Sequence, residues 1–397
     1  MSGLRPRLAW ARRKAGGAVR RARRLPKRVR QKYRTGRLKW AAIRKLAKRE
    51  REWQVPLRNR RPRWWLRGYL SRSVVLYDLD RRGGDNYISD LQRVFRLKRM
   101  VHPLLQDVIN NKLTTHLLLS MLDVRSAKLL GVYWRGAVHA FPSEGREPIA
   151  EYLRGLDTGK PVFFKVLAGA EGKNLVKLQR DSAEQWEVNG EQLGHEAACR
   201  VFEEQQHPMV VEEGLDQHPK VDELYPGAVN TIRVLTMLDV TDQQPFIVMA
   251  VQRIGTSQSQ HVDNWSRGGL SARIDVATGR LGPASRLPAG TELEWFDAHP
   301  DTGTPINGAE VPYWAQIRDT VLHAARILSF LEYIGWDIVV TPDGPVILEA
   351  NINTGMNVLQ VHQPLLADPR VRAYYVERGV APEAPDTQDP AAGGGPV

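Results

Sequence analysis

The sequence is nearly free of cysteine and has no long apolar segment. Cys199 is the only cysteine in 397 residues, which excludes an intrachain disulfide and a disulfide-stabilised secreted domain. A membrane-spanning helix needs about 20 mainly apolar residues in a row, and the sequence contains no such run. The N-terminus is basic but lacks the apolar core of a secretory signal peptide. We therefore expect neither a membrane span nor secretion.

Several common catalytic signatures are also absent. The phosphate-binding pattern GxxxxGK[ST] does not occur, and no spacing of cysteine and histidine matches a structural zinc site. No serine or cysteine stands out as a nucleophile beside a histidine base, and no internal repeat is visible. With 42% hydrophobic and 25% charged residues, the chain can form a sizeable core in two or three domains or subdomains.

Acidic residues are scarce in the first part of the chain. Residues 1–63 contain 25 lysines and arginines against two acids, Glu50 and Glu52, which gives a net charge of +23. The whole chain carries +13, so the remainder carries −10. A basic arm with interspersed tryptophans suits an anionic membrane surface or nucleic acid phosphates, and an organelle transit peptide has a similar composition. A solvated, partly disordered tail is the simpler interpretation.

The most informative stretch covers residues 334–357, which have the pattern of two short strands joined by a turn at residues 342–345. Alternate residues of a strand point to the same face, so Glu349 and Asn351 share a face, and Asp337 on the paired strand can lie beside them. Two carboxylates and an amide oxygen form a hard oxygen site that suits Mg²⁺ carrying a nucleotide phosphate. The alternative is a strand whose polar face is merely solvated.

A second informative feature is a strand lysine followed by a loop of small residues. Residues 161–167 form an apolar strand with one charge, Lys165, and the next residues include Gly169, Gly172 and Lys173. An ammonium group and backbone N–H groups can then reach a phosphate together. Ordinary β-hairpins contain the same combination, so this loop does not decide the function by itself.

Together, these segments resemble ATP-grasp enzymes. An aspartate, eleven further residues, Glu-x-Asn and then Thr-Gly-Met-Asn are similar to the closing metal-binding motif of D-alanine–D-alanine ligases. The resemblance implies that Asp337, Glu349 and Asn351 hold two Mg²⁺ ions that bridge the phosphates of ATP.

The same resemblance implies the nucleotide contacts. The segment of Lys165, Gly169, Gly172 and Lys173 corresponds to the phosphate-binding hairpin, a mobile flap. Lys112, in a helix like the one that opens many ATP-grasp domains, is expected to reach phosphate. The strand Pro-Met-Val-Val-Glu-Glu-Gly-Leu corresponds to the hinge between subdomains, and its acids Glu212 and Glu213 are the candidates for contacts with adenine and ribose.

Three further segments resemble the sugar-transfer-associated branch, which is related to α-L-glutamate ligases. They are the strand Asn-Thr-Ile-Arg, the arginine that closes the next strand, and the loop Asn-Trp-x-x-Gly-Gly. The resemblance implies that Arg233 first, and Arg253 second, stabilise charge on the transferring phosphoryl group. Asn264 is expected to contact phosphate or to cover the acceptor. One departure concerns Gly335, because D-alanine ligases carry an arginine at that position.

We therefore expect an α+β ATP-grasp fold in which two α+β subdomains clamp ATP. The expected parts are a basic, partly helical or disordered arm (1–63), an α/β lead-in domain (64–160), the small subdomain (161–215), the large subdomain with the metal site (216–380) and a disordered tail (381–397). We also expect a helix over residues 190–205 and a connection rich in glycine and proline over residues 282–310.

The resemblance implies ligase chemistry with ATP and Mg²⁺ as cofactors. A carboxylate substrate would be activated as an acylphosphate, and an amine acceptor, sugar-linked in cell-surface polysaccharide assembly, would then form an amide. A kinase acting on a small-molecule or sugar hydroxyl is the close alternative. A basic protein with an inactive ATP site, which binds a membrane or nucleic acid, is the third reading. The need for ATP favours a cytoplasmic protein, with the arm at the inner membrane face; nucleic acid is the less favoured partner.

Overall fold

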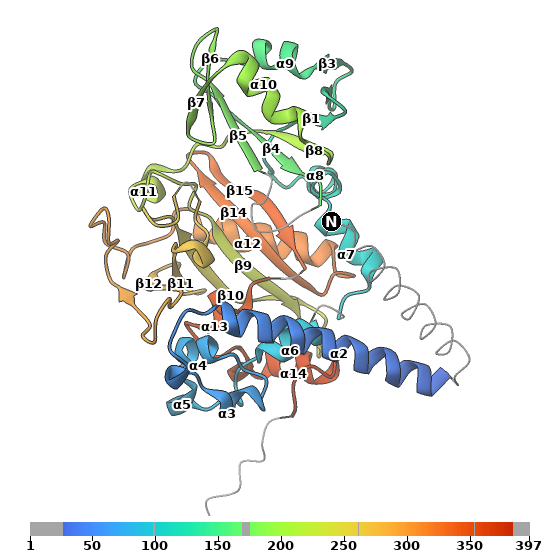
Figure 1. Cartoon of the computed structure of the whole chain (residues 1–397), viewed down its shortest axis with the longest axis vertical. Helices are drawn as coiled ribbons and strands as arrows, with labels where there is room; N and C mark the ends of the chain where they lie inside the picture. Colours follow the sequence, from blue (N-terminus) through green and yellow to red (C-terminus); the bar gives the residue numbers. More distant parts are fainter. Residues whose placement is uncertain (1–26, 98–99, 169–174, 261, 353, 384–397) are drawn as a thin grey trace, which may run out of the picture.

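The computed structural model describes residues 27–97, 100–168, 175–260, 262–352 and 354–383. Two antiparallel sheets dominate the molecule (Figure 1), and the smaller sheet lies beyond one end of the larger. A layer of helices from the N-terminal part of the chain lies at the opposite end. The fold is therefore α+β, as the sequence predicted.

The smaller sheet, so called because its strands are shorter, has eight strands in the order β3-β2-β1-β8-β4-β5-β6-β7. Its core contains Phe164, Leu178 and Trp186, which are fully buried and pack together with Phe202. The strands are β1 (Leu129–Trp134), β2 (Ala137–Ala140), β3 (Arg146–Pro148), β4 (Pro161–Val166), β5 (Leu175–Arg180), β6 (Gln185–Val188), β7 (Glu191–Gly194) and β8 (Met209–Glu213), with helices α9 (Ile149–Gly155) and α10 (His195–Glu203).

The larger sheet has seven strands in the order β13-β12-β11-β10-β9-β14-β15. Every residue of β9 and β14 is buried, which explains why both strands are nearly continuous apolar runs. The strands are β9 (Ile232–Leu238), β10 (Pro245–Ile254), β11 (Leu270–Ile274), β12 (Leu281–Arg286), β13 (Trp295–Phe296), β14 (Tyr333–Thr341) and β15 (Gly344–Asn351).

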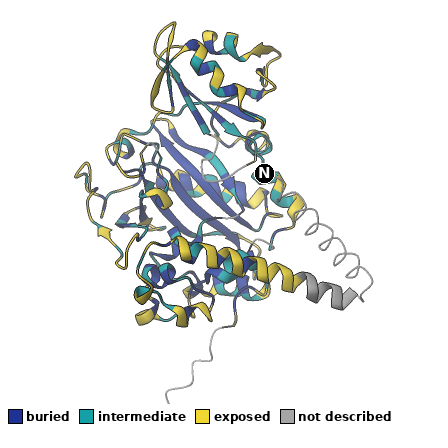
Figure 2. Cartoon of the chain, in the orientation of Figure 1, coloured by how far each residue is buried: buried dark blue, intermediate teal, exposed yellow. Residues whose placement is uncertain are grey.

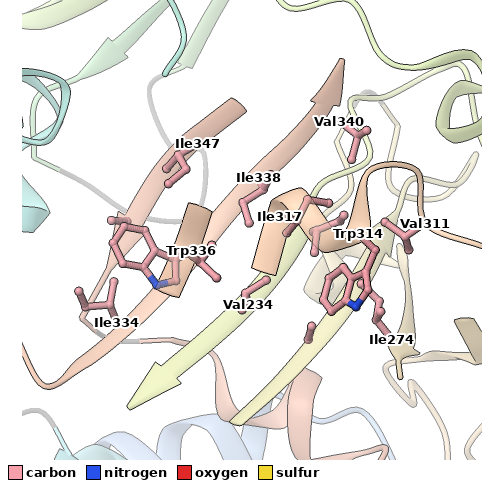
Figure 3. Close-up of a cluster of buried hydrophobic side chains, with 14 of the residues drawn as sticks. Val234, Ile274, Val311, Trp314, Ile317, Ile334, Trp336, Ile338, Val340 and Ile347 are labelled. Atoms are coloured by element: carbon pink, nitrogen blue, oxygen red, sulfur yellow. The ribbon is translucent and has the colours of Figure 1, made fainter. Parts of the chain in front are cut away.

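One face of the larger sheet packs against the helix α12 (Trp314–Ile327). Val234 and the alternate residues Trp336 and Ile338 of β14 belong to the same buried cluster as Ile317 of this helix (Figure 3). The cluster fixes which side chains face the core, because a strand register shift of one residue would turn them to the opposite face. The intervening residues of the strands therefore point away from α12.

Helices from both ends of the chain cover part of the opposite face. Leu235, Met237 and Val251 share a buried cluster with Trp64 near the N-terminus and Tyr375 near the C-terminus. Figure 1 shows these helices beside the larger sheet. They are α2 (Lys27–Glu52), α3 (Pro62–Trp65), α4 (Ser71–Tyr77), α5 (Leu79–Arg82), α6 (Asp90–Phe95), α13 (Met356–Gln360) and α14 (Pro369–Glu377).

The structure corrects the expected lead-in domain at residues 64–160. Its strands β1 to β3 belong to the smaller sheet, because β1 pairs with β8 at Val132 and Val210. Residues 64–97 pack on the larger sheet instead. The region is divided in this way because each part buries its apolar side chains against a sheet rather than in a core of its own.

The arm and two other segments also differ from expectation. Within the arm, Ala42, Leu46 and Trp53 are buried, so the inner half of α2 is part of the folded body. Residues 191–194 form β7, and the helix α10 begins only at His195. The connection at residues 282–310 contains β13 and most of β12, which lie at one edge of the sheet. Gly282 and Pro283 hid β12, and β13 is only two residues long. Among the described helices, none combines the length and apolar character needed to cross a bilayer.

Candidate active site

The predicted oxygen ligands lie on the face of the larger sheet that points away from α12. Strands β14 and β15 pair with Asp337 opposite Glu349 and with Gly335 opposite Asn351. Directly opposed residues of an antiparallel pair project to the same side, and the turn that brings the strands together is tightened by Gly344, whose φ is 111°. The structure therefore places the two carboxylates together, as the spacing in the sequence predicted.

Arg233 lies beside this pair on the other side of Asp337. Strands β9 and β14 place Arg233 opposite Asp337, and the guanidinium contacts both carboxylate oxygens, with Nη2 donating to Oδ2 over 2.7 Å. Asp337 is only 3% exposed. Burial alone would raise the pKa of Asp337, but the charges of Arg233 and Arg253 outweigh it and lower that pKa.

Arg253 completes the cluster from the next strand. Its Nε lies 2.9 Å from the hydroxyl oxygen of Thr231 and 3.3 Å from Asp263 Oδ2, and its Nη2 lies 3.5 Å from Asp337 Oδ2. Both predicted arginines thus face the predicted metal ligands. Because they also bind these acids, they fix the position of Asp337 in addition to supplying positive charge.

Lys112 reaches the cluster from the helix α8 (Lys112–Met121). Its Nζ lies 3.1 Å from Glu349 Oε1, and its backbone N–H donates to the carbonyl of Leu167 at the end of the predicted phosphate-binding strand. One residue therefore touches both sheets. The expected contact of Lys112 with phosphate stays a prediction.

Lys165 is held by a buried acid that the sequence analysis assigned to nucleotide contacts. Glu212 accepts a hydrogen bond from Lys165, and its other oxygen lies 2.9 Å from His116 Nε2. Burial would raise the pKa of Glu212, but the Lys165 charge and the His116 hydrogen bond lower it to about 2. The Glu212 side chain therefore orients Lys165, and sequence reasoning missed His116, although it lies one helical turn after Lys112.

The remaining predicted nucleotide contacts fall into two groups. Glu213 forms an ion pair of 3.3 Å with Lys128, and its backbone N–H donates to the Lys128 carbonyl. Gly169, Gly172 and Lys173 lie outside the described residues. A ribose contact through Glu213 stays a prediction, as does the flap.

Asn264 begins the short helix η3 (Trp265–Arg267). Its side-chain oxygen accepts hydrogen bonds from the backbone N–H and the hydroxyl of Ser266, at 2.9 and 2.8 Å. The following Gly268 has a φ of 102°, a conformation that favours glycine. Asn264 therefore has a structural task in shaping the loop that borders the cluster.

A cavity of about 570 Å³ joins six of the predicted residues. They are Arg233, Arg253, Asn264, Asp337, Glu349 and Asn351. The cavity is also lined by residues that sequence reasoning missed, including Arg93 and Asn357, which form a hydrogen bond of 2.6 Å across 264 positions. No local pattern could have revealed that pair. Lys165, Lys112, Glu212 and Glu213 are not among the described lining residues.

The donor set fits Mg²⁺. Asp337, Glu349 and Asn351 offer carboxylate and amide oxygens, the ligand type that Mg²⁺ prefers, and all three line one cavity beside two arginines. Among the described residues, no group of three or more histidine, cysteine or acidic side chains is placed to hold a metal by itself. A metal here would therefore depend on the Asn351 amide and on oxygens of the nucleotide.

The model of the sugar-transfer associated ATP-grasp family matches residues 96–372. The chain belongs to this family. The match covers more than half of the sequence and begins just after α6, so the ATP-grasp region includes both sheets and excludes α2 to α6. No curated protein sequence matches this ATP-grasp chain.

The chain is also similar, at low sequence identity, to several solved structures. A D-alanine–D-alanine ligase from Coxiella burnetii is 12% identical, with 69% of this chain and 58% of that chain covered and a TM-score of 0.37. An N5-carboxyaminoimidazole ribonucleotide synthetase in its ADP complex is 12% identical, with 67% and 48% covered and a TM-score of 0.36. A RimK domain ATP-grasp protein from Sphaerobacter thermophilus is 13% identical, with 77% of both chains covered and a TM-score of 0.35. The ATP-grasp chain thus spans about half to three quarters of these proteins.

Proposed function

We propose that this ATP-grasp protein is an ATP-dependent ligase that joins a carboxylate to an amine. One observation carries the proposal: Asp337, Glu349 and Asn351 line the same cavity as Arg233 and Arg253. Oxygen ligands for Mg²⁺ beside fixed positive charge are the parts needed to transfer a phosphoryl group.

The proposed reaction has two steps. The carboxylate oxygen of the donor attacks the γ-phosphorus of ATP, and the bond to the β–γ bridging oxygen breaks, which gives an acylphosphate and ADP. The amine then attacks the acyl carbon, loses a proton and displaces inorganic phosphate, which leaves an amide. Both steps need positioning and charge neutralisation and no nucleophilic side chain.

Each residue has a defined task in this proposal. Mg²⁺, when bound by Asp337, Glu349 and Asn351, would neutralise charge on the phosphates of ATP. Glu212 keeps the Lys165 ammonium oriented toward the nucleotide, because the two side chains form a buried hydrogen-bonded pair. Arg233 is a positioning residue for Asp337, since it already contacts both oxygens of that carboxylate.

Binding of Mg·ATP, measured by calorimetry on the full chain, is the first test. Glu349→Ala is the informative variant, and Glu292→Ala, an exposed glutamate outside the cavity lining, is the matched control. We expect the wild type and the control to bind Mg·ATP with similar affinity and Glu349→Ala to lose at least about 1.4 kcal/mol, a factor of ten. If neither the wild type nor the control binds, the ligase and kinase proposals both fall.

The products separate a ligase from a kinase. A mixture of carboxylates and amines should release ADP together with inorganic phosphate if the protein is a ligase. A kinase would release ADP and retain the phosphate on a hydroxyl of the acceptor. The family description, which names sugar transfer, supports sugar-linked amines in cell-surface polysaccharide assembly as the first acceptors to try.

We also propose that α2 holds the enzyme at the inner, anionic face of a membrane. Its outer side is exposed (Figure 2), with Trp40 at 66% and Ile43 at 44% exposure, three residues apart and therefore neighbours on the helix surface. Arg37, Arg44 and Lys48 lie among them. Apolar side chains surrounded by basic residues favour a helix that lies in the membrane interface. Nucleic acid is the alternative partner.

A further inference from the structure

The cavity beside the predicted metal ligands has a second wall, and that wall comes from outside the region matched by the family. Arg49 of α2, Arg72 of α4 and Arg93 of α6 line it, together with Arg267 of η3. The family match begins at residue 96. Three of these four arginines therefore belong to a helical layer that the family match does not include.

The cavity wall is more basic than a count of its charged residues suggests. Six arginines and six acids line it, but several acids are neutralised from outside the cavity. Glu50 pairs with Arg60, Glu52 with Lys48 and Glu349 with Lys112, at 3.1, 3.6 and 3.1 Å.

The other three acids are also engaged. Asp263 and Asp337 interact with Arg253 and Arg233. Asp90 accepts a hydrogen bond from the backbone N–H of Leu70 over 2.9 Å, and burial raises its pKa. The charges of Arg49 and Arg93 act on Asp90, and those of Glu50 and Glu52 act on Arg72. The wall still keeps an excess of positive charge, because Arg60, Lys48 and Lys112 offset three of its six acids.

Two of these arginines are prepared to bind a ligand. Arg93 is oriented by its hydrogen bond of 2.6 Å to the neutral side chain of Asn357, and its charge also acts on the nearby Asp90. Arg72 Nε is buried and has no hydrogen-bond partner among the described residues. A buried donor without a partner costs about 1–3 kcal/mol, which favours any reorientation of Arg72 that pairs this atom with an anion.

The cavity shares the predicted metal ligands with the nucleotide site but not the predicted nucleotide contacts of the smaller sheet. Lys165, Glu212 and Glu213 lie on the smaller sheet and are absent from the described lining residues, whereas Glu349 and Asn351 are present. A volume of about 570 Å³ is in the range of small-molecule sites. The cavity therefore extends from the predicted metal ligands to the arginines of the helical layer, and away from the side chains of the smaller sheet that are predicted to contact ATP.

We propose that this cavity binds a phosphate-bearing substrate other than ATP, with Arg72, Arg93 and Arg267 as its contacts. The guanidinium group binds phosphate through two parallel hydrogen bonds, and several arginines suit a dianion. The inference rests on the proposed function in one respect: the reacting end of the substrate would point toward the metal ligands. Substrate choice would then lie in the N-terminal helical layer.

The test is calorimetry of inorganic phosphate binding to the full chain, with succinate as a carboxylate probe. The variants are Arg72→Gln, Arg93→Gln and Arg267→Gln, and Arg82→Gln is the control, an exposed arginine of the same helical layer that does not line the cavity. We expect phosphate binding to weaken about tenfold in each variant and to stay unchanged in the control. Arg267 is exposed, so this variant keeps the test valid if the two inner variants fold poorly.

Two further measurements separate this inference from the proposed function. Glu349→Ala should keep phosphate binding and lose Mg·ATP binding. The arginine variants should keep Mg·ATP binding and lose phosphate binding. Loss of Mg·ATP binding in every protein, with arginine-dependent phosphate binding intact, would contradict the ligase and leave the anion site standing. The inference is overturned if phosphate does not bind, if the arginine variants bind it normally, or if only succinate binds.

Discussion

Arg233 and Asp337 occupy opposed positions on β9 and β14, and the arginine contacts both oxygens of the buried carboxylate. An acid in the middle of a fully buried strand is costly unless a partner neutralises it. The register of β9 against β14 supplies that partner, because it places Arg233 opposite Asp337. The fold therefore maintains an ionised Asp337 at the predicted metal site.

Breaking this pair should destabilise the protein strongly. We expect Arg233→Ala to lower the free energy of unfolding by about 3–5 kcal/mol, because it leaves a buried charge without a partner. Arg280→Ala is the control, since its ion pair with Glu310 is exposed and should contribute less than about 1 kcal/mol. Urea unfolding measures both. Equal losses in the two variants would contradict the assigned role of the Arg233–Asp337 pair.

The pair of Lys165 and Glu212 predicts a pH dependence. The pKa of Glu212 falls from 4.5 to about 2 on folding, so the ionised carboxylate stabilises the folded state. This stabilisation is fully present above pH 4.5 and is lost as the pH falls from there toward 2. At about 1.4 kcal/mol per pKa unit, a shift of this size corresponds to about 3 kcal/mol.

Glu212→Gln should therefore be less stable than the wild type at pH 7, and the difference should shrink below pH 4.5. Urea unfolding at pH 7, 5, 4 and 3 would show this trend. The matched control is Glu213→Gln, whose ion pair with Lys128 is largely exposed. A difference between wild type and Glu212→Gln that does not vary with pH would show that the pair is not the cause.

Gly335 explains a departure from the D-alanine ligase pattern. A Cβ atom at this position would lie 1.6 Å from Thr354 Oγ1 and 2.9 Å from Thr354 Cβ, so an arginine cannot stand here. We expect Gly335→Ala to lower the free energy of unfolding by about 1–3 kcal/mol. It should also weaken Mg·ATP binding, because a displaced Thr354 would shift the end of β15, where the predicted metal ligand Asn351 lies.

A double variant tests this contact. The Thr354 hydroxyl is buried and has no hydrogen-bond partner among the described residues, so Thr354→Ala alone should change stability by less than about 1 kcal/mol. Combined with Gly335→Ala, it should restore part of the lost stability, since the closest contact is removed. Additive losses in the double variant would rule out a steric origin.

The outer side of α2 predicts binding to anionic vesicles. Trp40→Ser combined with Ile43→Ser should lower cosedimentation with phosphatidylglycerol vesicles about tenfold or more, because two interfacial side chains are removed. Phe330→Ser, which replaces another half-exposed aromatic residue, is the control and should bind normally. Equal binding to neutral vesicles, or a preference for RNA with a steep salt dependence, would contradict the membrane proposal.

Part of this structure could be predicted because the signals are local. The alternation at Glu349 and Asn351 and the turn after Thr341 determine a hairpin, and the hairpin brings Asp337 opposite Glu349. Strand β4, with its single charge at Lys165, was likewise visible, because both the pattern and its consequence lie within a few residues. The predicted domain boundary at residue 160 was wrong because β1 pairs with β8. These two strands lie far apart in the sequence, so no local pattern indicates that they pair.

The sequence by itself determined the family, the two carboxylates and the amide of the predicted metal site, and the presence of Arg233 and Arg253. Only the tertiary structure decided what these groups contact: that Arg233 holds Asp337, that Glu212 orients Lys165, and that helices outside the matched region close the cavity. The physical reason is the separation along the sequence over which each interaction acts. Periodicity and turn chemistry act over a few residues, whereas ion pairs and cavity walls form between segments that meet only when their apolar faces pack.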